Sequence, residues 1–118
     1  MTQKDLQDRL KLYAIAIVKL AESLPESPGF RTVRNQIVRS GPSSAANYRA
    51  ACRGKSPADF KHKLEIVEEE LDETLFWLEF IVGLDEGKRM AISPLWKEGN
   101  ELVAIIVATI NAVKRKLK

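Results

Sequence analysis

The sequence has only one cysteine and one histidine, and these scarcities exclude several classes of protein. Cys52 has no second cysteine with which to form a disulfide inside the chain, which argues against a disulfide-stabilised secreted domain. We therefore expect a reducing, cytoplasmic environment. His62 alone cannot supply the Glu-x-x-His pairs of a di-iron bundle, and no such motif occurs in the chain.

Long apolar runs are also missing. The two most apolar stretches, residues 75–84 and 102–113, are short and interrupted by polar side chains. Both fall well below the roughly 20 apolar residues that a transmembrane helix needs. The first ten residues, MTQKDLQDRL, are polar and charged, so they do not resemble a secretory signal. We expect a soluble protein without a membrane partner.

Residue patterns that support catalysis or cofactor binding are absent as well. Cys52 and His62 lie ten residues apart across an expected helix boundary, with no third group to orient them. The segment Gly54-Lys55-Ser56 lacks the earlier glycine that a phosphate-binding loop requires. We therefore expect no catalytic residues, no metal site and no cofactor, and hence a protein that is not an enzyme.

What the chain does contain is helical periodicity. Its 118 residues fit one domain, and 45% of them are apolar. Apolar residues recur at steps of three and four, which places them on one face of a helix. The pattern predicts a single all-α domain over residues 1–118, an antiparallel up-down-up-down four-helix bundle. We expect its helices at about 4–24, 30–52, 57–83 and 94–117.

Prolines set the expected boundaries of these helices. Pro25 should end the first helix, and the pairs Ser56-Pro57 and Ser93-Pro94 are typical of a cap followed by a first helical residue. Pro42 falls in the middle of the second helix, where it removes one backbone hydrogen bond. Either that helix is continuous and kinked, or it is two short helices around a turn. We favour the kinked helix because the apolar spacing resumes in phase on both sides.

Charge is segregated along the chain. Residues 25–56 hold six basic residues and one acidic residue, a net charge of +5, whereas residues 57–83 have a net charge of −6. Positive density of this kind can bind phosphates without strict spacing. The candidate nucleic-acid contacts are Arg31, Arg34, Arg49, Arg53 and Lys55, with Lys114, Arg115, Lys116 and Lys118 as an auxiliary group. The alternative is a solvated basic helix that the acidic helix beside it neutralises.

Several segments of the second and third expected helices resemble a known family. They are QIVRSG from Gln36, SSAANYRAA from Ser43, KSPADF from Lys55, KLEI from Lys63 and ELDETLFWLE from Glu70. They resemble the bacterial four-helix-bundle family associated with intervening sequences in 23S ribosomal RNA genes. The resemblance covers nearly the whole chain, and its specific part lies between Gln36 and Leu84. Ala50 is a departure, because family members usually carry an acidic residue there.

The resemblance implies a homo-oligomer, typically a five-membered ring, with no assigned enzymatic activity. A related branch is similar to the accessory protein of diversity-generating retroelements, a basic ring that engages a reverse transcriptase and nucleic acid. Our first hypothesis is therefore a non-catalytic oligomeric scaffold that binds RNA or DNA electrostatically, with a reverse-transcriptase-like protein as a possible partner. The alternative is a protein–protein adaptor whose basic and acidic helices pair between subunits.

Two further groups of residues follow from the helical spacing. Arg39 and Asn47 share a face of the second helix, and Glu73 lies beside the apolar seam of the third. We expect these three to form a buried polar cluster, the alternative being that Arg39 is an ordinary surface residue. A second apolar face on the last two helices predicts an oligomer interface, unless the bundle core is simply wide. Its members are Trp77, Phe80, Ile81, Val103, Val107 and Ile110.

Overall fold

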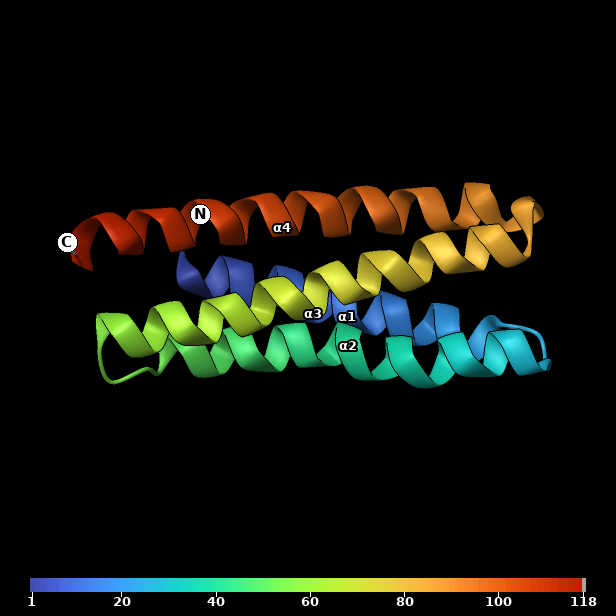
Figure 1. Cartoon of the computed structure of the whole chain (residues 1–118), viewed down its shortest axis with the longest axis horizontal. Helices are drawn as coiled ribbons and strands as arrows, with labels where there is room; N and C mark the ends of the chain where they lie inside the picture. The colour runs from blue at the N-terminus through green and yellow to red at the C-terminus, as the bar shows by residue number, and fades with distance from the viewer. Residues whose placement is uncertain (118) are drawn as a thin grey trace.

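The computed structural model describes residues 1–117, and within this range the chain forms four long α-helices and one short 3₁₀ turn (Figure 1). The elements are α1 (Gln3–Ser23), α2 (Pro28–Cys52), α3 (Pro57–Leu84), η1 (Glu86–Lys88) and α4 (Arg89–Leu117). Consecutive helices run in opposite directions along a body of 48 × 22 × 19 Å. The predicted antiparallel four-helix bundle is confirmed. None of the helices in residues 1–117 is both long and apolar enough to cross a membrane.

Side-chain caps start the first three helices. Thr2 and Asp5 form a reciprocal capping box on α1, at 3.0 and 2.9 Å. The Ser27 hydroxyl accepts from the Phe30 N–H, and the Ser56 hydroxyl accepts from the Asp59 N–H at 3.1 Å. Each of these serines precedes a proline at the start of the helix, where the missing proline N–H would have had no partner.

The fourth helix begins at Arg89, so the predicted start at Ser93-Pro94 is wrong. Asp85 supplies the cap instead: its side chain accepts from the Gly87 N–H at 3.0 Å, and the 3₁₀ turn leads directly into α4. Pro94 then lies inside the helix, where it removes one backbone hydrogen bond. Burial of Ile92 in the core holds this first part of α4 in place despite that loss.

Helix α2 is continuous through Pro42, and the alternative of two short helices is wrong. Ile37 and Gly41 before the proline and Ser44 and Tyr48 after it all face the core. Gly41 has a packing role, because a β-carbon there would lie 2.8 Å from Cγ2 of Ile17 on α1. The absence of a side chain thus lets α1 and α2 approach closely.

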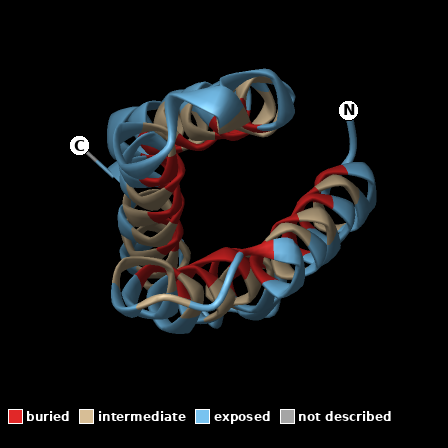
Figure 2. Cartoon of the chain, turned by 90° about the vertical axis from the view of Figure 1, so that its right-hand side faces the viewer, coloured by how far each residue is buried: buried red, intermediate tan, exposed pale blue. Residues whose placement is uncertain are grey.

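The core lies between the inner faces of the four helices, which carry the buried residues (Figure 2). Each helix packs extensively on the next one in the chain, whereas α1 and α4 share a narrower contact. There Tyr13 fits against Gly99, where a β-carbon would collide with the tyrosine hydroxyl. Arg9 on α1 pairs with Glu98 on α4 at 2.7 Å, which closes the same seam. Burial raises the pKa of the Tyr13 hydroxyl.

The sequence analysis did not predict one buried polar contact. Ser40 on α2 and Thr74 on α3 are fully buried, and their hydroxyl oxygens lie 2.8 Å apart. Thr74 also donates to the Glu70 carbonyl at 2.8 Å, so both hydroxyl groups are satisfied inside the bundle. Small hydroxyl side chains on an apolar face give no distinctive sequence signal, because they are equally common on exposed surfaces.

Candidate nucleic-acid interface

The basic residues of α2 lie at opposite ends of the bundle. Arg31 is in the first turn of α2 and Arg53 is its C-cap, so the length of a helix, about 33 Å, separates them. Because the bundle is antiparallel, the C-terminal turn of α4 lies at the same end as Arg53 (Figure 1). The predicted contacts therefore divide into two groups that cannot act on one short stretch of nucleic acid in a single subunit.

The larger group occupies the end where α2 and α4 finish, and we call it the basic end. Its members are Arg49, Arg53, Lys55, Lys114, Arg115 and Lys116, all of them exposed. None of the six forms an ion pair with another residue of 1–117. Lys118, which was predicted to act with the basic residues of the α4 C-terminus, lies outside the described residues. The basic end therefore presents positive charge that is not neutralised inside the chain.

A carboxylate at the same end is already engaged. Asp59, in the first turn of α3, accepts from the Lys55 backbone N–H at 3.3 Å and from the Lys63 ammonium at 3.2 Å. Lys63 lowers the pKa of the Asp59 carboxyl, which stays ionised. The ammonium group of Lys55 is left exposed.

At the opposite end Arg34, another predicted phosphate contact, is engaged within the chain. Its guanidinium donates to the carbonyl oxygens of Ala21, Leu24 and Pro25, at 3.3, 2.9 and 3.1 Å. These carbonyls belong to the last turn of α1 and the segment after it, which have too few backbone donors. Arg34 thus caps the C-terminus of α1. Arg31, one turn before Arg34 on α2, is exposed.

The predicted buried cluster of Arg39, Asn47 and Glu73 is wrong in two respects. Arg39 does pair with Glu73, and with Glu70 at 3.1 Å, but its side chain is 49% exposed. Asn47 takes no part, because its amide donates to the Ser43 carbonyl at 2.8 Å within α2. The pair lies at the rim of the α2–α3 contact, where a long arginine reaches water. Arg39 lowers the pKa of the Glu73 carboxyl.

The predicted oligomer interface also needs correction. Ile81 is 0% exposed and Ile110 is 4% exposed, so both belong to the core of the single chain. Trp77, Val103 and Val107 are half-buried, and Phe80 is exposed. The helical register explains the error: Ile81 and Ile110 follow the core positions Leu78 and Ile106 by three and four residues.

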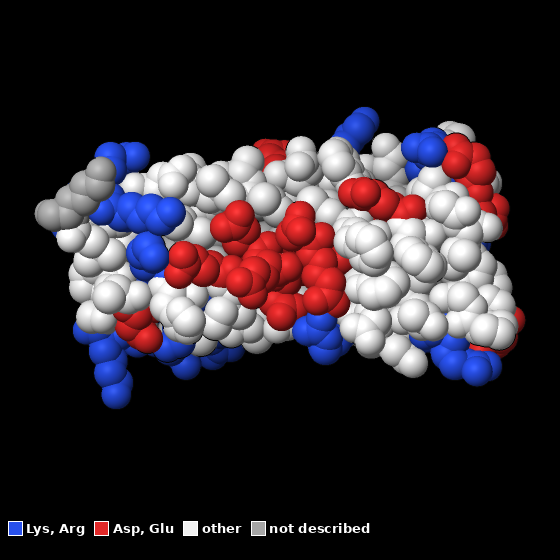
Figure 3. Space-filling model, in the orientation of Figure 1, with Lys and Arg blue, Asp and Glu red and all other residues white. Residues whose placement is uncertain are grey.

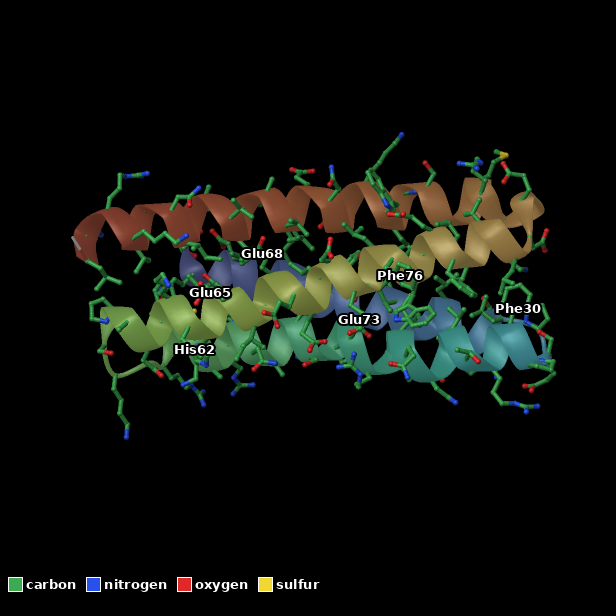
Figure 4. The ribbon with its side chains drawn as sticks, viewed as in Figure 1. Phe30, His62, Glu65, Glu68, Glu73 and Phe76 are labelled. Atoms are coloured by element: carbon green, nitrogen blue, oxygen red, sulfur yellow. The ribbon has the colours of Figure 1, made fainter. Side chains whose placement is uncertain are left out.

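Phe76, which the sequence analysis left out, is 52% exposed. Its ring contacts Trp77 edge-on with centroids 4.9 Å apart, and the Trp77 ring contacts Phe80 at 5.4 Å. These three side chains make an aromatic patch on the C-terminal half of α3. Charged side chains occupy the N-terminal half, where Figure 4 labels Glu65 and Glu68. In Figure 3 the acidic patch covers the middle of the viewed face, and uncharged surface continues toward the C-terminal end of α3.

Sequence reasoning also missed a groove on the outer side of α1 and α2, which we call the α1–α2 groove. Its volume is about 770 Å³. Ile15 and Val18 from α1 and Ala45 from α2 form an apolar floor, and Lys11 and Arg49 stand beside it. The spacing of Ile15 and Val18 could have indicated the groove, because it places them together on α1. The stronger inward apolar series indicates only one apolar face for that helix. Arg49 therefore belongs to this groove as much as to the basic end.

Comparison with known proteins gives the chain a family. The model of the family described as 23S rRNA-intervening sequence protein matches residues 5–108. A crystal structure from Bacteroides thetaiotaomicron, of a protein with unknown function from the S23 ribosomal protein family, has the same fold with a TM-score of 0.85. The two sequences are 30% identical over 94% of this chain and 99% of that one. No curated protein matches the sequence.

The family match spans the segment between Gln36 and Leu84 that carries the resemblance, together with most of α1 and of α4. The chain therefore belongs to the 23S rRNA-intervening sequence protein family.

Proposed function

We propose that the protein is a non-catalytic, homo-oligomeric scaffold of five subunits in a ring, which binds RNA or DNA through its basic end. The observation that carries the proposal is the gathering of exposed basic side chains from α2, the α2–α3 connection and α4 at one end of the bundle. Phosphate groups are the complementary ligand for such a surface, and they need no shaped pocket. The ring and its subunit number rest on the family resemblance.

Oligomerisation would strengthen nucleic-acid binding by the basic end, which is small in a single subunit. A ring repeats the basic end of each subunit around one axis, so the local positive potential rises with the number of copies. The contacts would be to phosphates, which position a strand without reading its bases. We therefore expect little sequence preference. A reverse-transcriptase-like protein remains a possible partner of the assembled ring.

Binding across a salt series tests the nucleic-acid part of the proposal. Mixed-sequence RNA and DNA should bind with an affinity that falls steeply as salt rises. Replacing Lys55 and Lys114 with glutamine should lower the magnitude of the log–log salt slope by roughly 1.4 to 1.8 for each subunit that contacts the strand, which loses two phosphate contacts. The matched control is Arg31→Gln with Lys97→Gln, which removes the same charge from exposed positions away from the basic end. Equal slopes for both variants would overturn the assignment to the basic end.

The alternative function is a protein–protein adaptor without nucleic-acid binding. The apolar floor of the α1–α2 groove and the aromatic patch on α3 favour it, because phosphates have no use for apolar surface. An adaptor would form the oligomer but show no salt-dependent affinity for either nucleic acid. A solution mass of 13.3 kDa, that of one chain, would contradict both functions in their oligomeric form.

A further inference from the structure

The α1 side of the α1–α2 groove has a regular order of side chains. Lys4, Asp8, Lys11, Ile15 and Val18 all line the groove, and they follow one another at steps of four and three. They therefore form one stripe along the outer side of α1. Charge occupies the N-terminal part of the stripe and apolar side chains the later part. Asp8 is held by Lys4 at 2.8 Å, and Arg49 of α2 adds positive charge at the same level of the groove.

Helix α3 carries an outer stripe with the complementary order. Glu65, Glu69, Asp72, Phe76 and Phe80 follow one another at steps of four, three, four and four, and so share one face. Glu69, Asp72 and both phenylalanines are exposed. The stripe is acidic in its N-terminal part and aromatic in its later part. Figure 3 shows an acidic patch over the middle of the viewed face and uncharged surface beside it.

The two stripes match in a single register. When α1 and α3 are laid side by side in the same direction, Glu65 meets Lys4, Asp72 meets Lys11 and Phe76 meets Ile15, all with one constant offset. The same offset places Asp8 opposite Glu69, but Asp8 already pairs with Lys4. Spacings of three and four on both helices are those of a helix pair that packs along a seam. Within one copy the backbones of α1 and α3 do not approach each other closely over residues 1–117, and the exposed residues of both stripes face outward, so these pairs cannot form inside the chain.

We propose that the α1–α2 groove of one copy receives the outer stripe of α3 from a second copy, in this register. The inference rests on the proposed homo-oligomer and assigns its subunit contact. Basic side chains outnumber Asp8 and Glu22 around the groove, so the acidic part of the α3 stripe meets net positive charge. The phenylalanines cover the apolar floor of the groove farther along the contact. Arg49 then faces Glu69 of the neighbouring copy, which leaves Lys55 and the α4 C-terminus for phosphates.

This contact joins two different surfaces, so it repeats around a ring or along a filament.

A charge-reversal experiment tests the contact. The groove variant carries Lys11→Glu and Arg49→Glu, and the α3 variant carries Glu69→Lys and Asp72→Lys. All four positions are exposed, so circular dichroism and thermal melting should show that both variants keep the fold. Like charges should weaken self-association by at least about 100-fold, and native mass spectrometry should show monomers. An equal mixture of the two variants should associate again, because the groove of each variant meets opposite charge on the other variant. The products should be dimers or open alternating assemblies, since two variants cannot alternate around a ring of five.

Disulfide trapping tests the register. In a Cys52→Ala background, Ile15→Cys with Phe76→Cys should form a ladder of covalently linked copies on oxidation. The matched control, Ile15→Cys with Met90→Cys, uses a position that is 89% exposed and outside the stripe. It should give no ladder. Equal ladders from both variants, or mixing that restores no association, would overturn the proposed contact while leaving an oligomer in place.

Two other outcomes separate this inference from the proposed function. If the groove variant loses RNA and DNA binding but keeps the mass of the wild-type assembly, the groove holds a nucleic-acid strand and the second copy is excluded from it. If the wild-type protein has the mass of one chain at micromolar concentration, both the contact and the oligomeric scaffold are overturned.

Discussion

The two ends of the bundle carry basic residues that serve different purposes. At the end where α1 finishes and α4 begins, Arg34 caps carbonyl groups and Arg89 pairs with Glu86 at 2.5 Å. There too, Lys88 lies 5.7 Å from the centroid of the Phe30 ring. At the basic end, Lys55, Arg53 and the α4 lysines have no ion-pair partner within residues 1–117. The comparison shows that a net charge counted along the sequence does not measure the charge that a surface can offer.

The largest expected effect comes from removing the capping arginine. Arg34→Ala should lower the free energy of unfolding by about 2 kcal/mol, because buried or half-buried carbonyls at the end of α1 lose charged donors. Arg53→Ala at the opposite end should change it by less than about 0.5 kcal/mol. Urea denaturation at one fixed protein concentration measures both. Equal effects would show that the two ends do not differ in this way.

Two of the three serine–proline pairs, one near each end of the bundle, should show effects of intermediate size. Ser56 caps α3 at the basic end, so Ser56→Ala should cost about 1 kcal/mol of stability. Ser93, at the other end, lies inside α4 and should tolerate alanine within about 0.5 kcal/mol. Thermal or urea unfolding of the two single variants measures both losses of stability. A larger loss at Ser93 would mean that α4 starts where the sequence pattern placed it.

The smallest effect is expected between the ends, at Arg39 and Glu73. The folded protein lowers the pKa of Glu73 below its ordinary 4.5, so its contribution to stability is present above that pH. The contribution is lost as the pH falls through the lower, folded value. Because Arg39 is half exposed, solvent screening limits it to about 0.5 kcal/mol.

Glu73→Gln should therefore cost at most that amount at pH 7 and make the acid-induced loss of stability slightly smaller. Urea unfolding between pH 3 and 7 measures both, with Glu68→Gln as the control, a carboxylate with no ion pair in the described residues. A loss of several kcal/mol at neutral pH would restore the buried cluster that the sequence suggested.

Much of the fold could be predicted because its signals are local. Helical spacing of apolar residues and the cap at Ser56 depend only on neighbouring positions, and both agree with the structure. The start of α4 could not be read in this way. Ser93-Pro94 has the residues of a cap, but the Asp85 cap and the burial of Ile92 extend the helix beyond it.

The candidate site was less predictable, since availability depends on contacts between distant residues. Arg34 and Arg49 are both arginines of α2, yet one is consumed by the end of α1 and the other stands beside a groove. Ile81 and Phe80 are adjacent in the sequence, but only Ile81 faces the core. A difference of one residue turns a side chain by about 100° around a helix, and packing alone decides which side is covered.

By itself the sequence determined the helical class, the four-helix arrangement and the family, because periodicity, caps and the segments that carry the family resemblance belong to the chain's own residues. Only the tertiary structure decided which charges remain free, where α4 begins and that α1 and α2 enclose a groove. The physical reason is that hydrogen bonding and burial are relations between helices. Their partners lie tens of residues apart, and no local pattern records them.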